Sequence, residues 1–245
     1  MPLIDVVRNA TRLDLTTEDG DPAPWALTPG LSGVELRSFE ASLPCKLPDE
    51  LRDLLSCCRG FVGGALDMVD FTGRDIDFEF SPAFPYGLPI ASDGFGNFWL
   101  VDLQPESRTW GPIYFVCHDP AVVLVQSAGL ESFLTELVKV NTPPYTSLIH
   151  DVREDAIFDV WTTNPGALDY EAAFAGADAD IRAFALELGP SFQVVDLRNA
   201  PVGFGFSWGR YGPDSIVKRH GEIPIFAYQR RDSWWRGLRR RLLGR

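Results

Sequence analysis

The sequence has few of the residues from which metal sites and catalytic nucleophiles are built. Its 245 residues include 3 histidines and 4 cysteines. His118, His150 and His220 are far apart, and neither a Cys-x-x-Cys nor a His-x-x-x-His spacing occurs. Because zinc needs convergent ligands and a serine or cysteine nucleophile needs a base in reach, we expect no metal, no cofactor and no catalytic residues.

Long apolar runs are also missing. No segment has 18 consecutive apolar residues, so no transmembrane helix is predicted. The N-terminus lacks the apolar core of a secretory signal. Cys57 and Cys58 are adjacent on a predicted helix and point about 100° apart, which suits neither a disulfide between them nor shared chelation. We therefore expect reduced thiols and a cytoplasmic protein.

Positive charge is scarce until the end of the chain. The sequence holds 22 Lys and Arg against 34 Asp and Glu, a net charge of −12. From Arg210 onward there are 10 basic and 3 acidic residues, whereas the first 209 residues hold 12 basic and 31 acidic residues. An acidic body argues against direct nucleic-acid binding, which needs basic groups to neutralise phosphates.

Turn-forming residues divide the chain into four parts. We expect a loosely held N-terminal arm over residues 1–29, a main domain over 30–144, a C-terminal α/β extension over 145–232 and a basic tail over 233–245. The boundary near residue 144 follows from Asn141-Thr142-Pro143-Pro144, which ends the helical pattern before it.

Apolar spacing predicts an α+β protein with short elements. Leu51, Leu54, Leu55 and Cys58 follow the i, i+3, i+4, i+7 stripe of a helix. The predicted helices cover residues 30–42, 47–58, 129–140 and 169–188. Strands are predicted over residues 65–71, 75–80, 98–103, 112–117, 122–126, 192–197, 204–208 and 223–229. Residues 81–89 contain three prolines and are expected to form a loop.

Acidic residues cluster in and around the second predicted strand. Asp75, Asp77 and Glu79 alternate and would lie on one face of a strand, next to Asp67 and Asp70. Paired carboxylates can catalyse glycoside hydrolysis. In a chain with 34 acidic residues, a solvated acidic face is the favoured interpretation, and such a face could bind a basic partner.

A glycine-bearing turn, Ser92-Asp93-Gly94-Phe95-Gly96-Asn97, precedes a predicted strand. Phosphate-binding loops place a helix after the glycines. Here a strand follows, which argues against a phosphate site. Asp93, Gly94 and Gly96 instead predict a tight structural turn with positive φ angles.

The chain ends in the basic segment SWWRGLRRRLLGR, residues 233–245. On a helical wheel Trp234, Trp235, Leu238 and Leu242 fall within a 100° arc, as in a short amphipathic helix. Such a segment could lie on an anionic membrane surface or dock on the acidic body of its own chain. We favour docking on the body of the chain, or a disordered end, over membrane binding.

Several segments, in order, carry a family resemblance. They are Leu47-Pro48-Asp49-Glu50-Leu51 with Arg59-Gly60, the turn Pro89–Asn97 leading to Asp102, the strand Ile113–His118, and the helix containing Ser132-Phe133-Leu134. Over about residues 30–140 the chain resembles the SMI1/KNR4 family of the SUKH superfamily. The resemblance implies an α+β fold with a central, mainly antiparallel sheet and flanking helices. It implies no catalytic residues.

The resemblance also implies a binding function. Bacterial members are mostly immunity proteins that neutralise toxins delivered between competing cells, many of them nucleases, and fungal members are interaction proteins in cell-wall control. We expect an immunity protein whose toxin-binding face includes Asp67, Asp70, Asp75, Asp77 and Glu79. Two alternatives stay open: a general regulatory or scaffold protein, and an unrecognised hydrolase using paired carboxylates.

Overall fold

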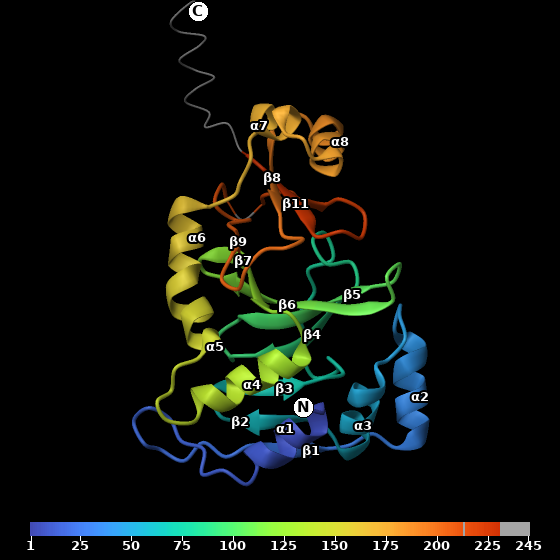
Figure 1. The fold of residues 1–245 in the computed structure, drawn as a ribbon, viewed down its shortest axis with the longest axis vertical. Helices are drawn as coiled ribbons and strands as arrows, with labels where there is room; N and C mark the ends of the chain where they lie inside the picture. The colour runs from blue at the N-terminus through green and yellow to red at the C-terminus, as the bar shows by residue number, and fades with distance from the viewer. Residues whose placement is uncertain (213, 231–245) are drawn as a thin grey trace, which may run out of the picture.

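The computed structural model describes residues 1–212 and 214–230. Its centre is an eight-stranded antiparallel sheet (Figure 1). In sheet order the strands are β1 (Ala26–Pro29), β2 (Cys58–Gly63), β3 (Leu66–Asp70), β4 (Gly87–Ser92), β5 (Phe98–Gln104), β6 (Thr109–His118), β7 (Ala121–Ser127) and β9 (Gly205–Phe206). A smaller antiparallel sheet has the order β10 (Val217–Arg219), β11 (Ile225–Gln229) and β8 (Phe192–Asp196). The predicted α+β fold with a mainly antiparallel sheet is confirmed.

Helices cover the large sheet and flank the small one (Figure 1). They are α1 (Leu3–Ala10), α2 (Gly33–Ser42), α3 (Asp49–Cys57), α4 (Leu130–Val140), α5 (Leu148–His150), the π-helical turn η1 (Asp151–Ala156), α6 (Ile157–Thr163), α7 (Tyr170–Ala175) and α8 (Ala179–Leu188). Local sequence explains several helix starts. A capping box joins Ser32 and Glu35 at α2, and Pro48 precedes the acidic first turn of α3. No helix in the described part of the chain is long and apolar enough to cross a membrane.

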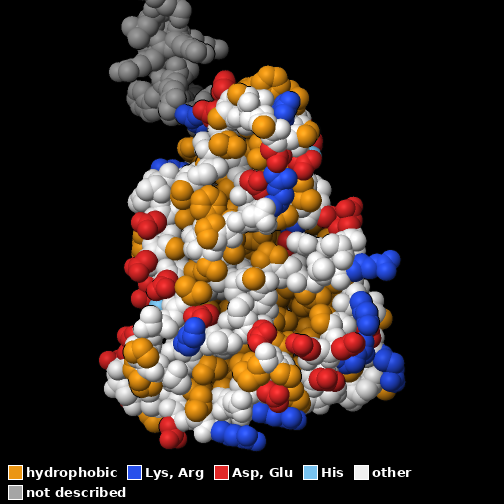
Figure 2. Space-filling model, in the orientation of Figure 1, with side chains coloured by type: hydrophobic (Ala, Val, Ile, Leu, Met, Phe, Trp, Pro, Cys, Tyr) orange, Lys and Arg blue, Asp and Glu red, His pale blue; other side chains and the backbone are white. Residues whose placement is uncertain are grey.

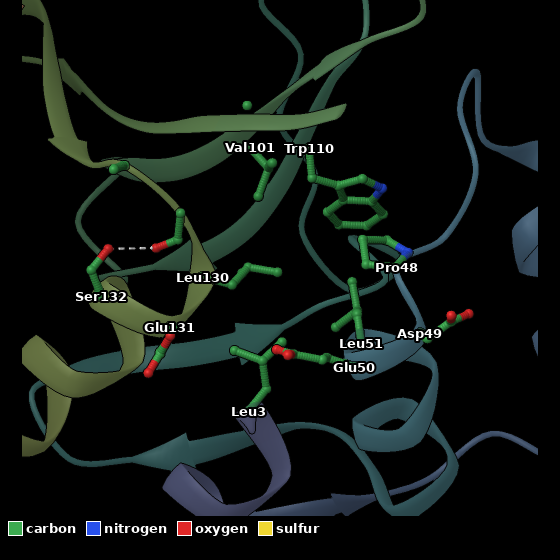
Figure 3. Close-up of a pocket in the computed structure, with 13 residues that line it drawn as sticks. Leu3, Pro48, Asp49, Glu50, Leu51, Val101, Trp110, Leu130, Glu131 and Ser132 are labelled. Atoms are coloured by element: carbon green, nitrogen blue, oxygen red, sulfur yellow. Dashed lines mark hydrogen bonds between the residues drawn. The ribbon is translucent and has the colours of Figure 1, made fainter. Parts of the chain in front are cut away.

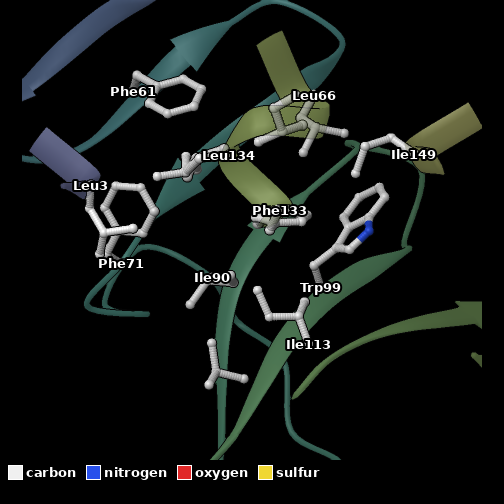
Figure 4. Close-up of a cluster of buried hydrophobic side chains, with 14 of the residues drawn as sticks. Leu3, Phe61, Leu66, Phe71, Ile90, Trp99, Ile113, Phe133, Leu134 and Ile149 are labelled. Atoms are coloured by element: carbon white, nitrogen blue, oxygen red, sulfur yellow. The ribbon is translucent and has the colours of Figure 1, made fainter. Parts of the chain in front are cut away.

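One hydrophobic core lies between the large sheet and helices α1, α3 and α4 (Figure 4). The predicted stripe of α3 supplies Leu51, Leu54 and Leu55, each fully buried. Trp99 of β5 reaches Phe133 of α4. The alternation of β5 sends Trp99, Val101 and Leu103 to this face of the sheet and Leu100 to the other.

The N-terminal segment differs from its prediction. Residues 1–29 were expected to form a loose arm, but α1 buries Leu3, Val6, Val7 and Ala10 in the first core. These four residues have the i, i+3, i+4, i+7 spacing of an amphipathic helix. In addition, β1 pairs with β2 at the edge of the large sheet. Both ends of the segment are therefore fixed by packing.

The predicted strand over residues 75–80 is wrong. That segment is irregular, and the strand before it ends at Asp70. The Asp70 carboxylate accepts hydrogen bonds from the Thr72 N–H at 2.8 Å, the Thr72 hydroxyl at 2.6 Å and the Asp75 N–H at 3.3 Å. These bonds turn the chain, and Gly73 with φ of +67° allows the turn. The loop predicted over 81–89 is also too long, because β4 begins at Gly87.

Much of the chain after α6 packs against the opposite face of the large sheet. Leu100, Tyr114, Val116, Val123 and Val125 of β5, β6 and β7 meet side chains of the small sheet in a second core. Strand β9 extends the large sheet by pairing with β7. Helices α5 and α6, which the sequence did not predict, add Ile149, Ile157 and Val160 to the first core. The division at residue 144 stays a prediction, and described residues on both sides of it share both cores.

A buried carboxylate on α4 binds the chain segment that follows this helix. Glu136 accepts hydrogen bonds from Lys139 Nζ at 2.6 Å, the Leu148 N–H at 2.8 Å and the Ser147 hydroxyl at 3.2 Å. Burial raises the carboxyl pKa, but these hydrogen bonds outweigh it, so the pKa of Glu136 lies below its ordinary value of 4.5. Such a group stabilises the fold above its unfolded pKa, and the stabilisation is lost as pH falls through the folded pKa.

We therefore expect Glu136→Gln to lower the free energy of unfolding by about 2 kcal/mol at neutral pH. The difference from the wild type should shrink as pH falls below 4.5. Urea unfolding at a series of pH values measures this. Glu187→Gln, on the exposed side of α8, is the matched control and should leave the profile unchanged. A difference that stays constant with pH would contradict the role of the ionised carboxylate.

Candidate protein-binding surface

The structure separates the five acidic residues that the sequence grouped together. Asp70 is 3% exposed, and its carboxylate is bound by Thr72 and lies 3.6 Å from an Arg59 nitrogen. Asp75 also pairs with Arg59. Neither is available for a partner in the way that a solvated acid is. Their shared arginine holds the irregular segment after β3 against β2.

Three of the acids combine the predicted exposure with a carboxylate that has no ion partner among the described residues. Asp67, Asp77 and Glu79 are exposed, and none forms an ion pair with a residue that the structure describes. Asp67 lies on β3, while Asp77 and Glu79 lie on the irregular segment. Their unpaired negative charges favour a basic partner.

An aromatic cavity adjoins Glu79. Its volume is about 240 Å³. Phe78 stacks on Phe98 with ring centroids 4.2 Å apart, and Phe80 lies 5.2 Å from the Trp208 ring. The lining residues are Phe78, Glu79, Phe80, Gly96, Phe98, Val116, Cys117, His118 and Trp208. The cavity therefore offers an apolar site with a carboxylate in its wall.

The glycine turn lies between Asp67 and this cavity. The Asp93 carboxylate accepts hydrogen bonds from the Phe95 N–H at 2.9 Å, the Asn97 N–H at 3.2 Å and the Asn97 side-chain amide at 2.7 Å. Gly94 and Gly96 have φ angles of +75° and +88°, which residues other than glycine rarely adopt. A Cβ at Gly94 would lie 3.3 Å from the Asp67 side chain. The turn is therefore held by the hydrogen bonds to Asp93, and it lies close to Asp67 of β3.

Phe95 projects from the tip of this turn. It is 81% exposed, more than any other large hydrophobic side chain in the described residues. We call Asp67, Asp77, Glu79 and Phe95, together with the cavity residues Phe78, Phe80, Phe98 and Trp208, the acidic–aromatic surface. Aromatic anchors and complementary charge are the features that dominate protein–protein contacts.

A second hollow lies where α1, α3 and α4 begin (Figure 3). It has a volume of about 600 Å³, and Leu3, Leu51, Leu130 and Trp110 line it. Figure 2 shows hydrophobic side chains gathered there, with acidic side chains beside them. The acids among its lining residues are Asp49, Glu50 and Glu131. These carboxylates already supply negative charge to the helix N-termini, so the hollow is unsuited to anions.

Reactive groups are not gathered in the described residues. No group of three or more His, Cys, Asp and Glu there could hold a metal ion. Cys45, Cys58 and Cys117 are buried. Burial raises the pKa of Cys58 to about 11, which leaves its thiol protonated and a poor nucleophile. His118 is exposed and contacts Asn97.

Comparison with protein families identifies the part of the chain that bears this surface. Residues 30–136 match the SMI1 / KNR4 family (SUKH-1). This part of the chain is an SMI1/KNR4 domain. No curated protein and no solved structure matches the chain. The SMI1/KNR4 family is generally non-catalytic, and membership in it is compatible with a binding role.

Most of the acidic–aromatic surface belongs to the SMI1/KNR4 domain. Trp208 is the exception, because it comes from the segment after the matched residues. The sequence prediction included the acids and the turn but missed Phe95 and Trp208. An aromatic residue between two turn glycines was the available signal for Phe95. Nothing local marks Trp208, because its place in the cavity depends on β9 pairing with β7.

Proposed function

We propose that the protein is an immunity protein that binds and neutralises a toxin in the cytoplasm of the cell that makes both. It acts by binding alone, without catalysis. The observation that supports this most directly is the acidic–aromatic surface, most of which lies on the SMI1/KNR4 domain. It combines three exposed carboxylates, which have no ion partners among the described residues, with the exposed Phe95 and an aromatic cavity. A toxin that acts on nucleic acid has a basic cleft, and acidic charge would steer and orient it.

The parts of this surface have separate tasks. Asp67, Asp77 and Glu79 supply charge complementarity and speed association. Phe95 supplies an anchor, and its turn is already held by Asp93 and Asn97. Because the turn is ordered before binding, little conformational entropy is lost when a partner engages it. The surface can therefore block a cleft by occupying it.

Co-expression with the product of the adjacent gene tests the function. We expect the two proteins to co-purify and the cells to survive. The triple variant Asp67→Lys, Asp77→Lys, Glu79→Lys should weaken binding at least about 100-fold, since close interfacial charge pairs couple by about 1.5–7 kcal/mol. Phe95→Ala should weaken it at least about tenfold. Binding is measured by calorimetry and protection by viability.

The matched control makes the same total change of charge at a different part of the surface. Asp14→Lys, Asp19→Lys, Asp21→Lys alters exposed acids of the N-terminal loop and should leave binding unchanged. Full protection by the first triple variant would show that the toxin binds another face. If no adjacent gene encodes a toxin and expression protects against none, the function itself is wrong. Recovery of several housekeeping partners in place of one toxin would instead support a scaffold protein.

A further inference from the structure

The basic tail is the feature of the sequence that a toxin-binding function does not explain. Residues 233–245 contain five arginines and no acid, together with Trp234, Trp235 and three leucines. This segment lies outside the described residues, which end at Arg230. The predicted choice between a membrane surface and the acidic body therefore depends on what the described residues offer to it.

The aromatic cavity is within reach of the point where the chain leaves the described residues. Tyr228, two residues before Arg230, stacks on Tyr211 with ring centroids 6.2 Å apart. Tyr211 is three residues after Trp208 of the cavity, a Cα separation of at most about 11 Å. Fifteen residues follow Arg230, and an extended chain of that length spans about 50 Å. The acidic–aromatic surface is well within that distance.

The chemistry of the cavity matches that of the tail. Its aromatic walls can accept a tryptophan or leucine side chain, because apolar burial and ring packing are both available there. Glu79 lines the cavity, Asp77 is two residues away, and neither has an ion partner among the described residues. Guanidinium groups form strong hydrogen bonds with carboxylates and also stack on aromatic rings.

We propose that residues 233–245 dock in cis on the acidic–aromatic surface. An apolar side chain of the tail occupies the cavity of Phe78, Phe80, Phe98 and Trp208, and its arginines face Asp77 and Glu79. Because both partners are on one chain, the effective concentration is in the millimolar range, so modest contacts suffice. The tail thereby shields an aromatic surface that would otherwise face water. The tail occupies part of the surface proposed above for the toxin, so a toxin that binds there must displace it, but the docking itself does not depend on the identity of any toxin.

Photo-crosslinking in the full-length chain tests the proposal. With p-benzoylphenylalanine in place of Trp235, irradiation should join the tail to residues 75–80, 95–98 or 208 within a single chain. The yield should not depend on protein concentration. Asp77→Lys with Glu79→Lys should lower it about tenfold, and adding Arg239→Glu with Arg240→Glu should restore it. Such a charge exchange cannot restore the yield if the first pair of changes merely disturbed folding.

One control and three outcomes complete the test. Asp19→Lys with Asp21→Lys makes the same charge change on a distant loop and should leave the yield unchanged. Cross-links to another part of the chain would overturn the proposal. A dimeric product that grows with concentration would show docking on a second copy. Loss of the cross-link when phosphatidylserine-containing vesicles are added, with co-sedimentation of the chain, would show that the tail prefers a membrane.

Discussion

Asp102→Asn is expected to lower the free energy of unfolding by about 3–5 kcal/mol. Asp102 of β5 and Arg219 of β10 are 1% and 4% exposed as side chains, and two hydrogen bonds of 2.7 and 2.8 Å join them. The Arg219 guanidinium lies over the rings of Phe84 and Phe226. The amide of asparagine keeps the shape of the carboxylate, so the cost comes from leaving a buried cation without its counter-charge.

Chemical denaturation followed by circular dichroism measures this effect. Arg52→Gln, which breaks a half-exposed pair with Glu40, is the control and should cost at most about 1 kcal/mol. The double variant Asp102→Leu, Arg219→Met should cost less than Asp102→Asn, because no unpaired charge stays buried. If Asp102→Asn costs no more than the control, the ion pair does not hold the two sheets together.

Trp99→Ala should lower the free energy of unfolding by a similar amount, about 3–5 kcal/mol. Trp99 is fully buried and packs on Phe115 and Phe133 in the first core (Figure 4). Its indole N–H also donates to Gln126 Oε1 at 2.9 Å, and the Gln126 amide in turn donates to the Leu148 carbonyl at 3.1 Å. The substitution therefore creates a cavity and leaves a buried acceptor unpaired.

Trp99→Phe separates the two contributions. It keeps most of the packing but removes the hydrogen-bond donor to Gln126, so we expect the free energy of unfolding to fall by about 1–3 kcal/mol. Thermal and urea unfolding of both variants provide the comparison. Equal losses for alanine and phenylalanine would mean that the hydrogen bond, and not the packing, makes Trp99 important. A near-zero loss for Trp99→Ala would contradict the assignment of this core.

Local patterns predicted the elements whose stability is local. The stripe of α3, the helix over residues 129–140 and the hairpin of β5 and β6 agree with the structure, because each pattern is long enough to identify its period. The strand over residues 75–80 failed because alternation alone cannot show that Asp70 will bind the backbone after it. Side-chain hydrogen bonds of this kind compete with strand pairing.

Features that depend on distant residues could not be predicted in the same way. The pairing of β9 with β7 and the Asp102–Arg219 ion pair join positions far apart in sequence. The acidic face illustrates the limit most clearly. Composition indicated negative charge around residues 67–79, but only the folded chain shows that Arg59 pairs with Asp70 and Asp75 and that the other three acids have no ion partner among the described residues.

The middle parts of the central strands have little surface left for recognition. There the side chains of β5, β6 and β7 alternate between the two cores and are buried, and only the ends of these strands contribute to the surface. Substitutions at the buried positions would change the fold before they changed a contact. The segment 72–80 and the turn 93–97 carry no such constraint on their exposed side chains. Exposed side chains such as Asp77, Glu79 and Phe95 can therefore change while the fold is retained.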